Sequence, residues 1–180
     1  MVTIDLVDIL PKHAWKRYSK RDLAKIQRIV IHHFAGRISI EEAARLHISK
    51  GWPGIGYHYV IDLDGTINIT QRLDTISYNV GNNNTPTIGI AVRGNWESKL
   101  PPTCTLFALT ELLESLMTTL GEMPVYGHND FRNTACPGGA LKKWITNKYG
   151  HKPQEMRIEL WKIQRWWNWL LGKHRHDHTS

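Results

Sequence analysis

Short runs of strand-forming residues alternate with helical patterns along the first 150 positions of this chain. The sequence RIVIHHF predicts a buried strand that runs into two histidines. Asp64-Gly65 is a turn signal between two runs of strand formers, so it predicts a hairpin. The predicted strands cover residues 28–34, 56–70 (as the hairpin), 87–94 and 125–127.

Helical patterns separate these strands. The segment 39–51 begins with Ser39 and Glu42, which are spaced to form a capping box, and it ends at the stop signal Gly51. Further helices are predicted at 103–121 and 139–150. Strands mixed with helices favour an α/β fold in which helices flank a mixed central β-sheet.

Residues 151–180 combine tryptophans, basic residues and an amphipathic stripe. The stripe predicts a C-terminal amphipathic helix, and it consists of Met156, Leu160, Ile163, Trp167 and Leu170. One interpretation is that this helix packs on the rest of the protein through the stripe. The other is that the remaining tryptophans and basic residues bind an anionic polymer or lipid surface. These residues are Trp161, Trp166, Trp169, Arg157, Lys162 and Arg165.

The formal net charge of +7 is concentrated at the two ends of the chain. Residues 1–28 carry seven Lys/Arg against three Asp/Glu, residues 151–180 carry six against three, and residues 29–150 carry ten of each. This distribution predicts a basic N-terminal segment (1–28), a neutral functional domain (29–150) and a basic, tryptophan-rich C-terminal helix and tail (151–180). Basic ends also suit a nucleic-acid binder, an alternative that predicts strongly salt-dependent DNA binding.

The sequence predicts neither a membrane span nor a signal peptide. No run of about 18 apolar residues occurs. The N-terminal residues include Asp5 and Asp8 and have no positive region ahead of an apolar stretch, so we expect synthesis in the cytoplasm. A disulfide between Cys104 and Cys136 has no support in such a context.

Candidate metal ligands stand where predicted strands end. His32 and His33 follow the first strand, His128 follows the last one, and Cys136 precedes a Pro-Gly turn that can bring its sulfur back toward His128. Catalytic zinc sites use three such ligands and leave one position open, and zinc held in this way acidifies water and polarises a carbonyl. The alternative is that the histidines are structural and the thiol is an inert buried one. Histidines without this context are expected to be structural, namely His13, His47 and His151.

Four segments form a more specific pattern: IVIHHFAG, GWPGIGYHYVIDLDGTI, NNNTPTIGIAVRGNW and GHNDFRNTACPG. In order and spacing they resemble the zinc-dependent N-acetylmuramoyl-L-alanine amidases, the family that includes phage endolysins and peptidoglycan recognition proteins. The resemblance covers roughly residues 28 to 145. It implies that the neutral domain 29–150 is a single zinc amidase catalytic domain.

The resemblance also implies roles for individual residues. The zinc ligands would be His32, His128 and Cys136, and Tyr57 would be catalytic. Thr134 occupies the position two before the cysteine, where some phage members have lysine and recognition proteins have threonine, so it would line the catalytic site.

Strand alternation separates neighbouring side chains around these positions. His33 should point away from His32, and His58 away from Tyr57, which leaves both histidines with structural or supporting roles. Ala91 lies in a strand where some relatives carry a glutamate base. Water activation would therefore depend on zinc, with Tyr57 as the phenol that handles protons or stabilises the oxyanion.

The implied function is zinc-dependent hydrolysis of the amide bond between N-acetylmuramic acid and L-alanine, with bacterial peptidoglycan as the partner. We expect a monomer without a nucleic-acid partner, whose tail could bind an anionic cell-wall polymer or lipid. Small size and cytoplasmic synthesis suit a phage or prophage endolysin that reaches the wall through a separate holin-type pore. One alternative is a recognition protein that binds peptidoglycan without cutting it, which the presence of Cys136 disfavours. Another is a regulatory role, because some phage amidases also inhibit an RNA polymerase.

Overall fold

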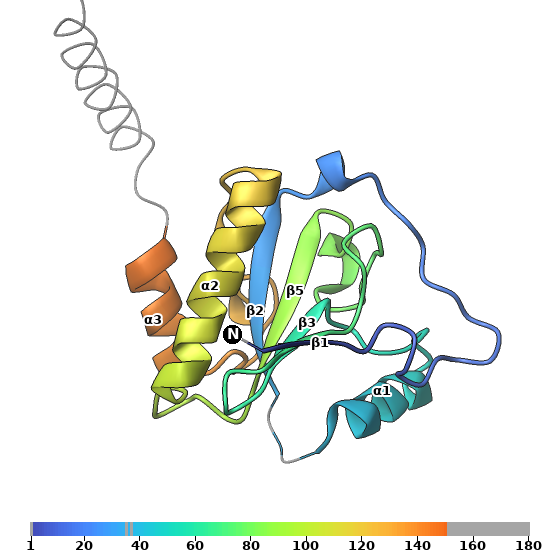
Figure 1. The fold of residues 1–180 in the computed structure, drawn as a ribbon, viewed down its shortest axis with the longest axis horizontal. Coiled ribbons are helices and arrows are strands. Elements are labelled where there is room, and N and C mark those ends of the chain that lie inside the picture. Colours follow the sequence, from blue (N-terminus) through green and yellow to red (C-terminus); the bar gives the residue numbers. More distant parts are fainter. Residues whose placement is uncertain (1, 35, 37, 151–180) are drawn as a thin grey trace, which may run out of the picture. The chain divides into compact units, whose positions relative to one another are not determined.

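The computed structural model describes residues 2–34, 36 and 38–150, and Figure 1 shows their fold. The described residues up to Tyr149 form one compact unit. The predicted C-terminal helix and basic tail (151–180) lie outside the described residues. In the described part of the chain, no helix is both long enough and apolar enough to cross a membrane.

A mixed six-stranded β-sheet forms the centre of the fold, in the order β1-β4-β3-β5-β2-β6. The strands are β1 (Thr3–Asp5), β2 (Arg28–Phe34), β3 (Tyr59–Ile61), β4 (Ile67–Ile69), β5 (Thr87–Arg93) and β6 (Val125–Gly127). The β3–β4 pair is antiparallel, and the other neighbouring pairs are parallel. This sheet confirms the predicted α/β class.

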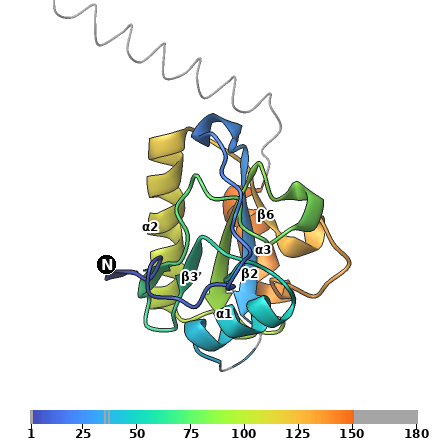
Figure 2. The ribbon, with the colours of Figure 1, turned by 90° about the vertical axis from the view of Figure 1, so that its right-hand side faces the viewer.

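Helices cover both faces of the sheet (Figures 1 and 2). They are α1 (Ile40–Ser49), α2 (Thr103–Leu120) and α3 (Gly139–Tyr149), with short 3-10 turns at η1 (Leu23–Lys25), η2 (Gly81–Asn83) and η3 (His128–Asp130). Helices α2 and α3 share a buried cluster with Ile29 and Ile31 of β2, whereas α1 packs with Phe34 in a second cluster. Because side chains alternate along β2, His32 lies on the α1 face and His33 on the face of α2 and α3.

Strands β2 and β5 are neighbours in the interior of the sheet. Their apolar runs fit strands that are covered on both faces, because such strands need apolar side chains at successive positions. Ile29, Val30 and Ile31 are fully buried. In the register of the two strands, His32 lies beside Ala91, which is also buried.

The local signals in the sequence are confirmed at several element ends. The Ser39 hydroxyl accepts the backbone N–H of Glu42 and the Glu42 carboxylate accepts that of Ser39, which completes the capping box. Gly65 turns the hairpin with φ of 87°, and Gly121 ends α2 with φ of 91°. Both angles lie in the left-handed region that favours glycine.

Strand β1 is an element that the sequence pattern does not predict. All three of its residues are exposed, so no alternation of apolar and polar side chains marks it. Backbone pairing with β4 holds it instead, and the N–H of Leu6 continues this pairing to the carbonyl of Ile69 at 2.8 Å. An ion pair between Arg72 and Asp5 (2.6 Å) joins the same two segments.

Candidate metal centre

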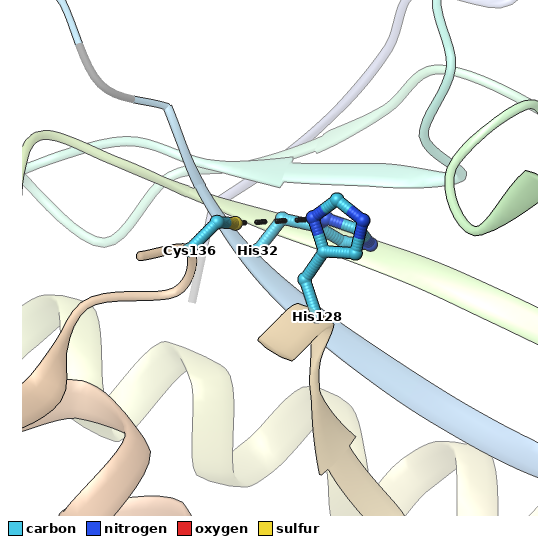
Figure 3. Close-up of side chains that lie close together, drawn as sticks. All are labelled: His32, His128 and Cys136. Carbon is cyan, nitrogen blue, oxygen red and sulfur yellow. Dashed lines mark hydrogen bonds between the residues drawn. The ribbon is translucent and has the colours of Figure 1, made fainter. Parts of the chain in front are cut away.

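Three potential metal ligands meet at the carboxyl ends of β2 and β6 (Figure 3). They are His32, His128 and Cys136, and one ligand atom of each lies within 4.8 Å of the other two. The Cys136 Sγ lies 3.8 Å from the Nδ1 of His32, the contact drawn as a dashed line in Figure 3. The two imidazole rings have centroids 4.5 Å apart.

The donor set and its spacing fit a zinc ion. Bonds of about 2.0–2.1 Å to nitrogen and about 2.3 Å to sulfur place tetrahedral ligand atoms about 3.3–3.7 Å apart. The separation of 3.8 Å between Cys136 Sγ and His32 Nδ1 is close to that range. Three protein ligands would leave the fourth position for water or substrate, which is the arrangement of catalytic zinc sites.

His32 is held by the sheet and by a hydrogen bond behind its ring. Its backbone is paired within the sheet, and its side chain is 1% exposed. The Nε2 of the ring lies 3.2 Å from Oδ1 of Asn79, so Nδ1 is the nitrogen that faces Cys136. A ligand on a paired strand has little freedom to move away from the centre.

The segment after β6 is folded so that both of its ligands face the same position. The Asp130 carboxylate accepts the backbone N–H of Gly127 at 2.9 Å, which shapes the turn that carries His128. The N–H of Asn129 donates to the carbonyl of Cys136, also at 2.9 Å. This second bond ties the two ends of the loop together and so keeps His128 and Cys136 close to each other.

Burial sets the protonation of the three ligands. It lowers the pKa of His32 to about 3, to which the nearby His128 contributes. The pKa of His128 is lowered first by burial and then by the positive charge of Arg132. Burial raises the pKa of Cys136 to about 11, and the N–H of His33, which donates to the sulfur at 3.3 Å, partly offsets this. At neutral pH the metal-free centre therefore holds neutral imidazoles and a protonated thiol.

Tyr57 and Thr134 lie next to the ligands. The Tyr57 ring is half-buried, and its centroid lies 5.1 Å from that of His32. Burial raises the pKa of this phenol above its usual range and the nearby Cys136 adds to the effect, so the hydroxyl stays protonated. The Thr134 hydroxyl accepts the backbone N–H of Cys136 at 3.3 Å and so supports the loop that carries the thiol.

The other two histidines of the four family-like segments are placed differently. His58 is fully buried, and its ring contacts the backbone of Gly89 (3.1 Å) and Thr75 (2.9 Å). His33 is half-buried, and its Nδ1 has no hydrogen-bond partner among the described residues. Neither ring belongs to the group of three ligands.

A pocket of about 410 Å³ opens beside the ligands. Its lining consists of Trp52, Tyr78, Asn79, Gly81, Asn84, His128 and Arg132, none of which is acidic. The rings of Trp52 and Tyr78 have centroids 6.0 Å apart and form an aromatic wall. Arg132 is exposed and lies over Gly81, where a Cβ would overlap its guanidinium group. The pocket therefore offers aromatic surface and a cation next to the metal centre.

Sequence reasoning did not select several residues of this region. His47, expected to be structural, stacks on Trp52 with centroids 4.6 Å apart and meets Tyr57 edge-on at 5.6 Å. Asn79 and Arg132 lie in irregular segments, where no sequence periodicity predicts which residues a side chain will contact. The available signal was proximity in sequence, because Arg132 lies between two candidate ligands and His47 lies one turn ahead of the Gly-Trp segment.

Comparison with known protein families places the chain in one of them. The family model described as N-acetylmuramoyl-L-alanine amidase matches residues 22–139, more than half of the chain. The chain therefore belongs to the N-acetylmuramoyl-L-alanine amidase family, in agreement with the resemblance of its four segments.

Individual relatives include a phage lysin and solved structures of two kinds. The endolysin of Enterobacteria phage K11 is 26% identical over 113 residues, covering 60% of this chain and 75% of that protein. The amidase LysC from Clostridium intestinale URNW superposes with a TM-score of 0.70 at 24% identity, covering 84% of this chain and 99% of LysC. Peptidoglycan recognition protein LE was solved with tracheal cytotoxin, a monomeric diaminopimelic acid-type peptidoglycan. It superposes with a TM-score of 0.76 at 21% identity, covering 86% of this chain and 98% of the recognition protein. The two structures show that amidases and recognition proteins share this fold.

The protonation of the centre predicts how it binds zinc. Because the imidazoles carry no proton that zinc must displace and the Cys136 thiol does, zinc binding at about pH 7.5 should release about one proton, which comes from Cys136. Affinity should then rise about tenfold per pH unit between about pH 7 and 9. Calorimetric titration of zinc into the metal-free protein, in buffers of different ionisation enthalpy, measures the proton. Cys136→Ser should bind weakly and without this release, whereas an unchanged, pH-independent affinity would contradict the assignment.

Proposed function

We propose that this chain hydrolyses the amide bond between N-acetylmuramic acid and L-alanine in bacterial peptidoglycan, with zinc held by His32, His128 and Cys136. The convergence of their three ligand atoms carries the proposal. Two neutral imidazoles and one thiolate, with a coordination position left open, suit a catalytic rather than a structural zinc site. Membership of the amidase family supports the same bond as the target.

Zinc, when bound, supplies Lewis-acid polarisation of the amide carbonyl and a lowered pKa for the attacking water. The chain's own ligands keep the centre positive, because the Cys136 thiolate is its single anionic donor and the neutral His32 and His128 cancel no further charge. Ala91, beside His32, brings no carboxylate into this environment. Both features favour the build-up of negative charge on a carbonyl oxygen at the centre.

Tyr57 is the proposed proton-handling residue. Its phenol keeps its proton, so it can donate a hydrogen bond to the carbonyl oxygen as negative charge develops there. It can also pass a proton, directly or through water, to the amine of L-alanine as the amide bond breaks. Among the described residues no group hydrogen-bonds to the Tyr57 hydroxyl, which leaves this donor available to a substrate.

The pocket beside the ligands is the proposed binding site for the peptide stem of peptidoglycan. Trp52 and Tyr78 offer apolar contact to the stem, and Arg132 offers a cation to one of its carboxylates. The complex of recognition protein LE with a peptidoglycan fragment supports a ligand of this class on the shared fold. Action as a phage endolysin through a separate pore stays a prediction. Wall binding by residues 151–180 concerns a segment outside the described residues.

The second candidate function is peptidoglycan binding without hydrolysis, because recognition proteins share the fold. Cys136 favours the enzyme. A protein that only binds needs the aromatic wall and Arg132, but it does not need a thiol aimed at two imidazoles.

Digestion of purified peptidoglycan separates the two functions. The zinc-loaded protein should release new L-alanine amino termini, measured by amine labelling and mass spectrometry, without new reducing sugar ends. Cys136→Ser should lose this activity because it removes an anionic ligand, while it should still bind the insoluble wall. Wall binding by the wild-type protein with no cleavage would decide for the recognition function, whereas equal activity of Cys136→Ser would contradict the role of the thiol in the reaction.

Tyr57→Phe tests the phenol. The variant should keep its zinc content but lose about 100-fold or more in kcat, the loss typical of a proton-transfer or oxyanion group. Tyr59→Phe is a matched control, because Tyr59 packs against the core on the other face of the sheet. Steady-state rates on a soluble muropeptide measure both variants. If Tyr57→Phe kept the wild-type rate, its hydroxyl would have no part in the reaction.

Arg132→Gln tests the pocket. Loss of a charge-assisted hydrogen bond should weaken binding of a muropeptide by about 10-fold or more, so KM should rise while kcat changes little. A muropeptide whose stem carboxylates are amidated should bind wild type and variant alike. Arg45→Gln, which alters an exposed arginine paired with Glu41 on α1, serves as the control. If Arg132→Gln bound the ordinary and the amidated muropeptide equally more weakly than the wild type does, Arg132 would not recognise a carboxylate.

A further inference from the structure

A chain of buried polar groups runs from the metal centre into the interior of the protein. The Nε2 of His32 lies 3.2 Å from Oδ1 of Asn79, and Nδ2 of Asn79 lies 2.8 Å from the Ser77 hydroxyl. The Ser77 hydroxyl lies 3.0 Å from Nδ1 of His58, and Nε2 of His58 lies 2.9 Å from the carbonyl of Thr75. Every member of this chain is less than 9% exposed.

In this series of buried polar groups, every donor points inward, away from the metal centre. The N–H of Gly89 donates to Nδ1 of His58, so this nitrogen is an acceptor and Nε2 carries the proton that is donated to Thr75. The Ser77 hydroxyl can then donate to Nδ1 of His58 while it accepts the amide N–H of Asn79. Asn79 consequently turns its carbonyl oxygen toward His32, where it can only accept.

The inner end of the chain is rigidly held. Arg21 lies beside His58, with Nη2 and Nε2 3.0 Å apart, a close approach that is not a hydrogen bond while Nε2 donates to Thr75. Its guanidinium donates to the carbonyls of Leu73 (2.9 Å), Thr85 (2.6 Å) and Thr87 (2.8 Å). Burial first, and then this positive charge, lowers the pKa of His58 to about 3. His58 therefore stays neutral, and its Nδ1 remains an acceptor at any pH at which the protein would act.

Asn79 is also confined from the other sides. The Oδ1 of Asn84 accepts the backbone N–H of Asn79 at 2.9 Å and that of Val80 at 2.8 Å. On the side of β5, a Cβ on Gly89 would lie 2.7 Å from Cγ of Asn79. A glycine inside a strand often marks such a close approach. The Asn79 amide is thus held at a defined distance from His32.

We propose that Asn79 is a positioning residue for the metal centre: its side-chain oxygen holds the proton of His32 on Nε2 and leaves the Nδ1 lone pair facing Cys136 and His128. Ser77 and His58 hold the amide of Asn79 in the orientation that this requires. Metal-binding histidines commonly depend on such a partner for the correct tautomer and ring orientation. The inference rests on the proposed zinc site, but it concerns the state of His32 before any metal or substrate binds.

Direct observation of the His32 tautomer is the first test. Long-range ¹H–¹⁵N correlation NMR of the metal-free wild-type protein at about pH 7.5, where a histidine of lowered pKa is neutral, should show the proton on Nε2 of His32. A proton on Nδ1 would overturn the proposal. This readout needs neither zinc nor catalysis, so it is independent of the proposed amidase activity.

Substitutions at Asn79 form the second test. Asn79→Leu keeps the approximate size but removes the acceptor, so zinc affinity should fall about 10- to 100-fold and the His32 signals should show both tautomers. Asn79→Asp keeps an acceptor, so it should retain the Nε2–H tautomer. Unlike Asn79→Leu, it should bind zinc at least as tightly as the wild type. Chelator competition measures the affinities, and the cobalt-substituted spectrum reports the ligand geometry.

Asn68→Leu is the matched control, because Asn68 is another buried amide, which bonds to Val60 and Asp62 instead. It should lower stability without changing zinc affinity or the His32 tautomer. If Asn79→Leu bound zinc as tightly as the wild type, or if Asn68→Leu lost as much affinity, the role of Asn79 would be one of general packing. If Asn79→Leu does not fold, a switch of Asn79→Asp to the Nδ1–H tautomer would overturn the proposal equally.

Discussion

The parallel pairing of β2 with β6 is the constraint on which the candidate metal centre depends. Parallel strands place their carboxyl ends at the same edge of a sheet, so residues that follow the two strands are neighbours in space. His32 near the end of β2 and His128 directly after β6 meet for this reason. The loop between η3 and α3 then has to position only one more ligand, Cys136. The buried apolar side chains that anchor β2 and β6 in the core therefore determine where the ligands stand.

Burial acts in opposite directions on the two kinds of ligand. It keeps His32 and His128 neutral, with lone pairs free for a metal, and it keeps the Cys136 thiol protonated. The metal-free centre consequently contains no buried, unpaired charge, which would be costly in this environment. A divalent cation changes the balance, because it makes the thiolate favourable. The same fold can thus be stable without metal and still bind it strongly.

The elements of the fold were accessible from local patterns, whereas much of the site was not. Apolar runs and capping signals located β2, β5 and α1, but β1 has no pattern of its own and exists through its pairing with β4. Residues alone left His32 and His33 as alternatives, and only the family resemblance chose between them. The structure brings His32 into the group of three because it lies on the face of β2 that Tyr57 shares.

Side chains that act through long-range contacts were beyond the reach of sequence patterns. Asn79 carries no signal in an irregular segment, and its contact with His32 depends on the close approach to Gly89 in β5. Arg132 is one of many basic residues until the fold sets it over Gly81 at the edge of the pocket. In both cases the informative feature is a glycine, whose missing side chain makes room for a functional one. Such a feature becomes meaningful only once the partner is known.

The metal centre and the pocket are separable sets of residues that meet at two points. Cys136 belongs to the metal centre alone, and Trp52, Tyr78 and Arg132 belong to the pocket alone. A protein on this fold could therefore lose the thiol and keep a binding site for peptidoglycan. His128 and Asn79 belong to both sets, since His128 is a candidate ligand and Asn79 contacts His32, while both line the pocket. A ligand in the pocket would therefore lie directly against His128 and Asn79, so the proposed binding of a peptide stem would be coupled to the geometry of the proposed reaction.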